Sequence, residues 1–353
     1  MTKELELYEN TIEGAEDEPI LPPSDIFTTN EIRSCAELYR MVHENSLNTQ
    51  PEYQRNVVWN NADKTRFIDS LAKRLPIPSL CISVSNEKYE VIDGQQRISA
   101  IVSFLNENSD ADWRLSHLSD VDPKLSGKKV SEIRKSEPEL YSRIRNTMLP
   151  VTSVYCDYSR SEHLEYIYKI FHRLNTGGLT LNNQEIRNCV FFGPFNSLIK
   201  TLDSNENWLK IMKGVAGSNR LKGQERILMF FAFVDSLSEY TGRLTTFLNT
   251  YMIENRNLTE DAISTKSQLF HRVLAIAKNI KYGKNSRVMM DAILYGIAKN
   301  IDRLETKSKE EIIDMYNELI CAPEFNSESL SEGLWQKESA TRRLNKAKEI
   351  FQC

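Results

Sequence analysis

The chain has 353 residues, 40% of them hydrophobic and 27% charged, and its formal net charge at pH 7 is −4. This composition is typical of a globular protein with a sizeable core, in one large domain or two. Its longest apolar run, residues 227–234, is far shorter than the roughly 20 residues that cross a bilayer, which argues against a membrane protein.

Cysteine usage and the N-terminus both favour a cytoplasmic location. The six cysteines are scattered without any Cys-x-x-Cys pair, which predicts reduced thiols rather than a disulfide framework. The five histidines are dispersed as well, so we expect no zinc site. The acidic N-terminus lacks the basic and apolar segments of a secretory signal.

Charge is unevenly distributed along the chain. Residues 1–19 hold seven acidic side chains and one basic one, a net charge of −6 that leaves about +2 for the remainder. We therefore predict an acidic mobile arm, residues 1–23, that is ended by Pro22-Pro23. Charge alone neither supports nor excludes contact with DNA, because a local basic face is compatible with the remainder.

Residues 24–190 are predicted to alternate short strands and helices. Pro76 and Pro78 mark the end of one helix, and residues 107–135 have too little apolar pattern to predict an element. We expect strands over 26–29, 80–84, 89–92 and 151–155, and helices over 36–44, 63–75, 94–106, 138–147 and 162–174.

From about residue 190 onward the apolar residues follow helical spacing almost throughout. The sequence therefore predicts an α/β N-terminal domain, residues 24–190, followed by an all-helical C-terminal domain, residues 191–353. The clearest helices of the second domain are expected over 227–237, 262–280, 288–301 and 310–320.

The segment Val-Ile-Asp-Gly-Gln-Gln-Arg-Ile-Ser-Ala-Ile, residues 91–101, joins a predicted strand to a predicted helix through Asp93-Gly94. A strand that enters a helix through a tight glycine turn aims backbone N–H groups and the positive end of the helix dipole at one point. An anion binds well there, and Arg97 adds a planar cation suited to phosphate oxygens. The segment thus predicts a nucleotide phosphate site.

Helix capping is the alternative interpretation of the same segment. Asp93 is a good N-cap residue, and Gln96, three residues later, would complete a capping box. Capping does not explain why two glutamines, Gln95 and Gln96, are followed directly by Arg97. From the residues alone, both interpretations stay open.

A second informative segment is Pro-Glu-Tyr-Gln-Arg, residues 51–55, followed by Trp59. Arg55 could close on a triphosphate from the side opposite Arg97 and supply a second bidentate contact. The alternative is a surface arginine stacked on Tyr53 or Trp59.

A third segment is Phe-His-Arg-Leu-Asn-Thr-Gly-Gly, residues 171–178, followed by Leu-Thr-Leu-Asn-Asn-Gln-Glu, residues 179–185. Gly177 and Gly178 suit the exit from a helix. In the functional interpretation Asn175, Thr176, Gly177 and Gly178 form a loop that approaches a base or sugar. Asn182 and Glu185 form a candidate capping box for the next helix.

Several common nucleotide and hydrolase motifs do not occur in this chain. It has no Gly-x-x-x-x-Gly-Lys-Ser/Thr segment, which argues against a P-loop NTPase, and no Gly-x-Gly-x-x-Gly segment for a dinucleotide. It also lacks the Gly-x-Ser-x-Gly turn of the α/β-hydrolases.

Taken together, the segments at 51–55, 92–97 and 171–185 resemble, in order and spacing, the GmrSD N-terminal domain family, which has a ParB/sulfiredoxin-like fold. The resemblance covers residues 24–190 most closely. It implies a small mixed sheet with helices, and a nucleotide-hydrolysing module of bacterial anti-phage restriction systems. The sulfiredoxin branch has a reactive cysteine where this chain has Gln95-Gln96, so sulfur chemistry is not expected.

In the family the Asp-Gly-Gln-Gln-Arg segment serves the nucleotide, and the resemblance implies the same role for the matching residues here. We expect catalytic roles for Asp93, Gln95, Gln96 and Arg97, and nucleotide contacts from Gly94 and Arg97. The resemblance also implies that the Tyr-Gln-Arg segment, Tyr53, Gln54 and Arg55, lines the same pocket.

The resulting hypothesis is an NTPase that uses Mg²⁺. Arg97 and Arg55 would clamp the phosphates, and Gln95 or Gln96 would orient a water molecule. Asp93 and Glu185 are candidate metal ligands, each with a capping alternative, so the metal ligands and the preferred base stay unassigned.

Two further hypotheses stand beside the NTPase. The chain could be a nucleotide-gated DNA- or partner-binding switch without significant turnover, or an interaction protein that has lost the chemistry. Residues 190–353 contain no His-Asn-His nuclease signature, so we expect a separate nuclease or effector as partner. Modified phage DNA is a further candidate partner, and a homo-oligomer is compatible with the sequence.

Overall fold

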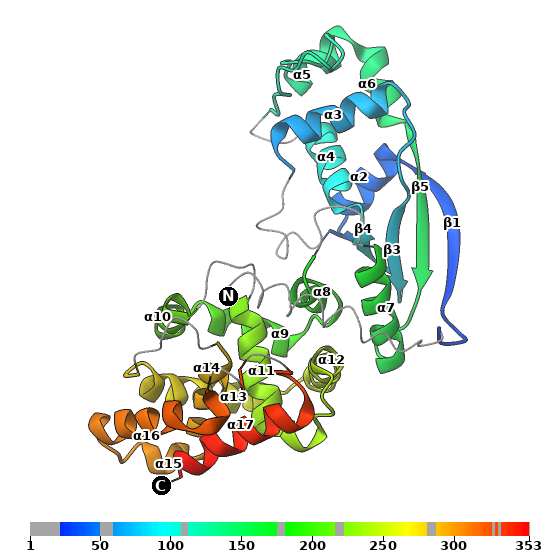
Figure 1. The fold of residues 1–353 in the computed structure, drawn as a ribbon. Helices are drawn as coiled ribbons and strands as arrows, with labels where there is room; N and C mark the ends of the chain where they lie inside the picture. Colours follow the sequence, from blue (N-terminus) through cyan, green and yellow to red (C-terminus); the bar gives the residue numbers. More distant parts are fainter. Residues whose placement is uncertain are drawn as a thin grey trace. The chain divides into compact units, whose positions relative to one another are not determined.

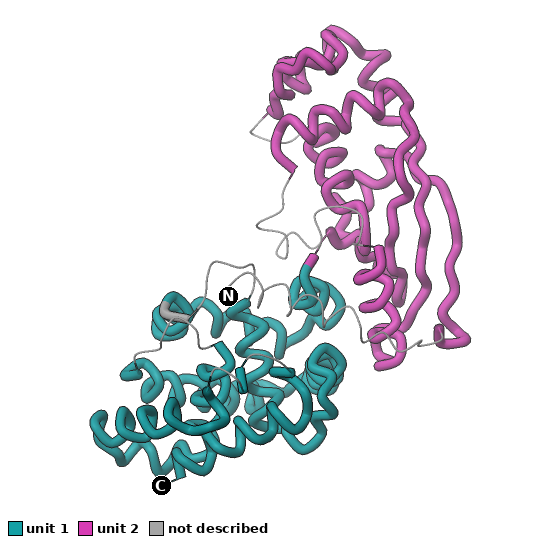
Figure 2. The backbone as a smooth tube through the Cα atoms, in the orientation of Figure 1, with its two compact units in different colours: residues 1–20, 182–353 teal, residues 21–181 magenta. Residues whose placement is uncertain are grey.

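A computed structural model describes residues 22–49, 59–106, 112–174, 181–215, 222–280, 287–326, 329–330 and 333–352. Its described residues form two compact units, one within residues 21–181 and one within residues 182–353 (Figures 1 and 2). The first unit contains the sheet, and the second is helical. This arrangement confirms the predicted order of an α/β region followed by a helical region.

A five-stranded mixed sheet forms the centre of the first unit, in the order β1-β5-β3-β4-β2. The pairs β1/β5 and β3/β4 are antiparallel, whereas β5/β3 and β4/β2 are parallel. β5, β3 and β4 are therefore interior strands, each paired with a neighbour on both sides over part of its length. The strands are β1 Phe27–Ser34, β2 Leu47–Asn48, β3 Leu80–Ser85, β4 Lys88–Asp93 and β5 Met148–Tyr155.

Helices of the first unit bury their apolar stripes around one core with the sheet. α4 packs against both α2 and α3, α3 also contacts α6, and α7 lies against β4 (Figure 1). Ile68, Ile82 and Ile98 are fully buried in this core. The helices are α2 Cys35–His43, α3 Asn61–Ala72, α4 Gln95–Leu105, α5 Val130–Ser136, α6 Pro138–Arg145 and α7 Ser161–Leu174.

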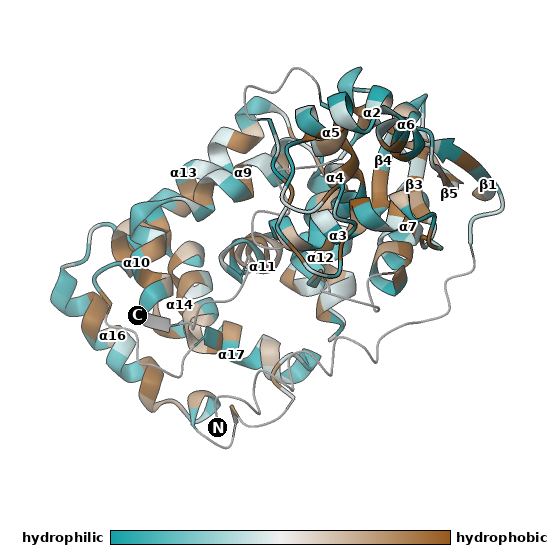
Figure 3. Ribbon diagram, turned by 90° about the horizontal axis from the view of Figure 1, so that it is seen from above, coloured by the Kyte–Doolittle hydropathy of each residue, from teal (hydrophilic) through white to brown (hydrophobic). Residues whose placement is uncertain are grey.

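The second unit is a helical bundle with an aromatic centre. The ring of Phe231 lies 5.9 Å from the rings of both Phe195 and Phe270, measured between ring centroids, and all three side chains are fully buried. Figure 3 shows hydrophobic and hydrophilic residues alternating along helices such as α16. The α-helices are α8 Asn183–Val190, α9 Pro194–Asp203, α10 Glu206–Val215, α11 Lys222–Ser236, α12 Leu244–Asn255, α13 Glu260–Ala277, α14 Arg287–Lys299, α15 Ile301–Leu304, α16 Lys309–Cys321 and α17 Lys337–Ile350, with 3-10 turns at η2 Leu237–Glu239 and η3 Pro323–Phe325.

Several element boundaries differ from the predictions. α3 ends at Ala72 instead of 75, because the chain turns at Arg74 and the Leu75 N–H donates to the Ser70 carbonyl at 2.9 Å. β1 and β5 are longer than predicted. Helix α5 lies in the region where no element was predicted. α8 packs on α11 and α12 in the second unit, although it ends at the predicted domain boundary.

Candidate functional site

The predicted phosphate turn lies where β4 ends at Asp93 and α4 begins at Gln95. Gly94 is the N-cap of α4, with φ +100° and ψ +13° and no side-chain cap bond. A Cβ atom at this position would lie 2.2 Å from Leu80 Cδ2. Glycine is therefore required here both by the left-handed backbone and by the packing of β3.

The capping box that was one of two interpretations of this segment is wrong. Gly94, not Asp93, is the N-cap, and Asp93 is the last residue of β4. The Asp93 carboxylate instead accepts from Arg97 Nη2 at 2.6 Å.

Arg97 ties three parts of the first unit together. Its side chain is only 12% exposed, and besides the Asp93 pair it donates to the carbonyls of Pro78 and Ser79. These carbonyls belong to the segment that leads into β3. In this structure the guanidinium is thus held by protein oxygens, and a phosphate would have to replace some of them.

Gln95 and Gln96 bind Thr49 and Trp59, which flank residues 50–58 with the predicted Tyr-Gln-Arg segment. Gln95 Nε2 donates to the carbonyl of Thr49, and Gln96 Oε1 accepts from the Trp59 N–H at 2.9 Å. Residues 50–58 themselves are outside the described residues. Sequence reasoning missed this anchoring, because neither Thr49 nor Trp59 carries a signal that points to α4.

The remaining predicted nucleotide contacts cannot be placed. Tyr53, Gln54 and Arg55 lie outside the described residues, as do Asn175 to Gly178. The capping box of Asn182 and Glu185 is confirmed, with backbone-to-side-chain distances of 2.9 and 2.8 Å. Glu185 is only 3% exposed, so its carboxylate serves the start of α8.

The cysteine beside the turn on β3 is affected by burial and by the charge of Asp93. Cys81 is the register partner of Asp93, and burial, together with the charge of Asp93, raises the pKa of the Cys81 thiol to about 12. The thiol beside the turn is therefore protonated at neutral pH and is a poor nucleophile.

A carboxylate that could take part in Mg²⁺ binding is present at the turn. The Asp93 side chain is 40% exposed, and Mg²⁺ in phosphate sites commonly takes one or two carboxylates together with substrate oxygens and water. Within the described ranges no group of three or more His, Cys, Asp or Glu side chains could hold a metal ion. Asp93 therefore fits a metal ion that arrives with a nucleotide better than one held by the protein alone.

Comparison with known proteins gives one match. Residues 36–192 match the family described as GmrSD restriction endonuclease, N-terminal domain. No curated protein and no solved structure matches the chain, so the ParB-like fold stays a prediction. Of the helices in the described part of the chain, none has the length and apolarity to cross a membrane.

Proposed function

Residues 36–192 belong to the GmrSD restriction endonuclease N-terminal domain family, and on that premise we propose that this restriction-system component binds and hydrolyses a nucleoside triphosphate. The hydrolysis would support a separate nuclease or effector that acts on phage or modified DNA. The observation that carries the proposal is the turn at Gly94, where a strand enters a helix with Arg97 in the first helical turn.

This turn supplies the two features that phosphate binding needs. The N-terminal end of α4 brings the positive end of a helix dipole to Gly94. Arg97 lies on the same turn and presents a permanently charged fork. Phosphoryl transfer depends mainly on positioning and on stabilising charge, so few catalytic groups are required.

Residue roles follow from the contacts around the turn. On nucleotide binding, Arg97 would exchange the carboxylate of Asp93 and the carbonyls of Pro78 and Ser79 for phosphate oxygens. The released Asp93 would then be available to Mg²⁺, which neutralises charge on the phosphates when bound. Gln95 and Gln96 would position residues 50–58, or orient the attacking water.

The test is phosphate release from ATP, GTP, CTP and UTP with Mg²⁺, in the presence and absence of DNA. We expect Arg97→Ala to lower turnover by about 10²–10³, the usual effect of losing one charge-stabilising donor. Arg97→Lys keeps the charge but loses the planar fork, and we expect it to lower turnover by about tenfold.

Arg33 provides a matched control for the fold. It lies on β1 of the same unit, and its side chain is 13% exposed and pairs with Glu31 at 3.0 Å and Glu37 at 2.9 Å. Arg33→Lys should therefore leave turnover unchanged. Equal rates for wild type and folded Arg97→Lys and Arg97→Ala would contradict the assignment of Arg97.

A nucleotide-gated switch is the second candidate, and the contacts of Arg97 favour it specifically. Because a phosphate would have to displace Arg97 from Pro78 and Ser79, nucleotide binding would alter a segment of the protein even without hydrolysis. Tight nucleotide binding with no phosphate release in any condition would support the switch and contradict the NTPase.

A further inference from the structure

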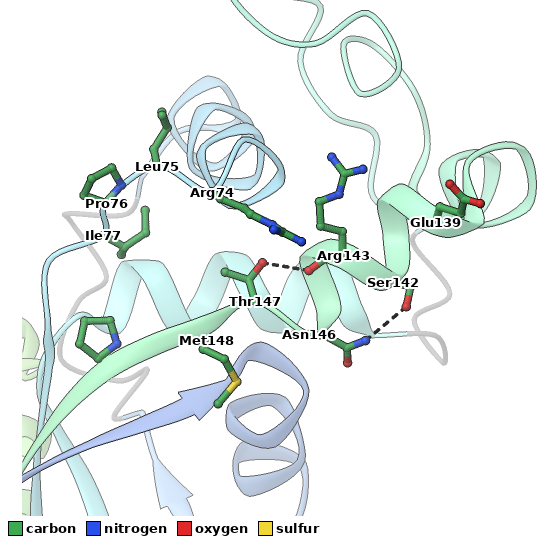
Figure 4. Close-up of a pocket in the computed structure, with 11 residues that line it drawn as sticks. Arg74, Leu75, Pro76, Ile77, Glu139, Ser142, Arg143, Asn146, Thr147 and Met148 are labelled. Carbon is green, nitrogen blue, oxygen red and sulfur yellow. Dashed lines mark hydrogen bonds between the residues drawn. The ribbon is translucent and has the colours of Figure 1, made fainter.

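A groove in the first unit lies apart from the Gly94 turn. It encloses about 810 Å³ between the end of α3, the end of α6 and the start of β5 (Figure 4). Arg74 enters it from the α3 side, Arg143 from α6, and Met148 from β5. The proposed nucleotide function uses none of these residues.

Arg74 occupies a backbone conformation that glycine or asparagine would fill with less strain. It has φ +56° directly after the C-cap of α3, where its N–H donates to the Leu71 carbonyl at 3.1 Å. An arginine in this left-handed position is uncommon, which suggests that its side chain serves a purpose other than stability.

Two lysines near the groove are held in ion pairs. Lys73 pairs with Asp69 at 2.6 Å, and Lys124 pairs with Glu137 at 2.7 Å. For the guanidinium groups of Arg74 and Arg143, the described part of the chain provides no ion pair. Both side chains are exposed, so their charges are available to an anionic ligand.

The groove also has an apolar wall. Leu75 is 50% exposed and Met148 is 51% exposed, although both side chains are large and hydrophobic. Pro76, Ile77 and Pro150 also line the groove and add apolar surface. An exposed apolar wall beside two unpaired cations suits a ligand that carries charged groups along a partly apolar body.

We propose that this groove binds the phosphodiester backbone of a nucleic acid, with Arg74 and Arg143 contacting phosphates and the apolar wall contacting sugars or bases. Arginine forks match phosphate oxygens bidentately. An extended acidic peptide is less suitable, because peptides in such grooves gain affinity by pairing with a free strand edge. β5 borders the groove with Met148 and Pro150, which pair with β1 on one side, whereas the pairing of β5 with β3 begins only at Val151. The free edge beside the groove is therefore short, and Pro150 has no N–H to donate to an added strand.

The test measures binding of a fluorescein-labelled 20-mer, single-stranded and duplex, by anisotropy over a range of salt concentrations. The variants are Arg74→Gly and Arg143→Gln, singly and together. Each lost phosphate contact should weaken duplex binding about eightfold at 0.1 M salt and lower the slope of log K against log salt by about 0.9. Arg74→Gly removes the charge while relieving the backbone, so its Tm should equal or exceed that of the wild type.

Two single variants complete the design. Arg66→Gln, on α3 but paired with Asp120 at 2.8 Å, should leave binding unchanged. The groove also contains one carboxylate, Glu139, and Glu139→Gln should strengthen binding because it removes repulsion of the phosphates. Unchanged affinity and salt slope in the double arginine variant would overturn the proposal.

Competition identifies the class of ligand. Poly-L-glutamate that displaces the oligonucleotide at equal charge concentration, and that itself binds more tightly than DNA, would overturn the proposal in favour of an acidic polypeptide. The inference does not depend on the proposed NTPase. The groove variants should keep the nucleotide turnover that the wild type shows without DNA, and DNA affinity is measured without nucleotide, so the two proposals can fail separately.

Discussion

Gly94 is the residue on which the geometry of the candidate site depends most directly. Its positive φ allows β4 to enter α4 without an intervening loop, and its missing side chain makes room for Leu80. The same turn brings the side chains of Asp93 and Arg97 together, and they pair. A larger residue at 94 would therefore disturb both the sheet and the ion pair.

We predict that Gly94→Ala destabilises the first unit by about 2–4 kcal/mol, from the left-handed backbone and the contact with Leu80. Urea unfolding followed by circular dichroism measures the change. Gly127→Ala is the control: Gly127 has φ +71°, but a Cβ there would meet the side chain of His117 at 3.3 Å or more. Gly127→Ala should lower the free energy of unfolding by about 1–2 kcal/mol, the cost of the left-handed backbone alone. Equal losses for the two variants would show that the Leu80 contact is unimportant.

At the scale of elements, α8 is unusual because all eight of its residues are buried although most are polar. Arg187 accounts for much of this arrangement. It is 1% exposed, its Nε donates to Asn249 at 2.8 Å, and its Nη1 pairs with Glu225 at 3.0 Å. These bonds join α8 to α11 and α12, so the helix is held by side-chain polar contacts as well as by packing.

Replacing Arg187 with methionine keeps most of the volume but removes every one of these bonds. We predict a loss of about 3–5 kcal/mol in the free energy of unfolding, as for other broken buried pairs. Arg272→Met, at the exposed cluster with Asp302 and Glu305, should leave the urea midpoint nearly unchanged. A midpoint for Arg187→Met close to that of the wild type would mean that the buried network adds no net stability.

Neighbouring residues in the sequence predicted helices and strands better than the contacts between distant segments. The periodicity of α7 and the Asn182–Glu185 box are visible in neighbouring residues, and both are confirmed. The two-residue strand β2 was missed because only its pairing with β4 defines it. The Asp93 capping box failed for a similar reason, since the packing of Leu80 on Gly94 fixes the turn and cannot be read from residues 93–96.

The same limit applies to the candidate site. The sequence identified Gly94 and Arg97, because glycine turns and arginines at helix starts have known chemistry. It could not show that the guanidinium of Arg97 reaches the carbonyls of Pro78 and Ser79, which lie 19 and 18 residues earlier. These contacts depend on the antiparallel pairing of β3 with β4, and so on the whole sheet.

On the scale of the molecule, residues 75–79 connect the two proposed sites of the first unit. Leu75, Pro76 and Ile77 line the groove, whereas the carbonyls of Pro78 and Ser79 accept from Arg97. A nucleotide whose phosphates bind the Arg97 guanidinium would break its hydrogen bonds to these two carbonyls. Since the groove has its present form while Arg97 holds the segment, we expect nucleotide binding to weaken nucleic-acid binding.

The prediction is a drop in oligonucleotide affinity of about fivefold or more at saturating non-hydrolysable nucleotide, within the usual range of coupling between sites. The coupling must be reciprocal, so the oligonucleotide should weaken nucleotide binding by the same factor. Anisotropy and calorimetry measure the two factors separately. The Arg74→Gly/Arg143→Gln protein should show much less coupling, because its groove no longer binds strongly. An oligonucleotide affinity that is identical with and without nucleotide would mean that residues 75–79 keep their position when Arg97 changes partners, and that the two sites act independently.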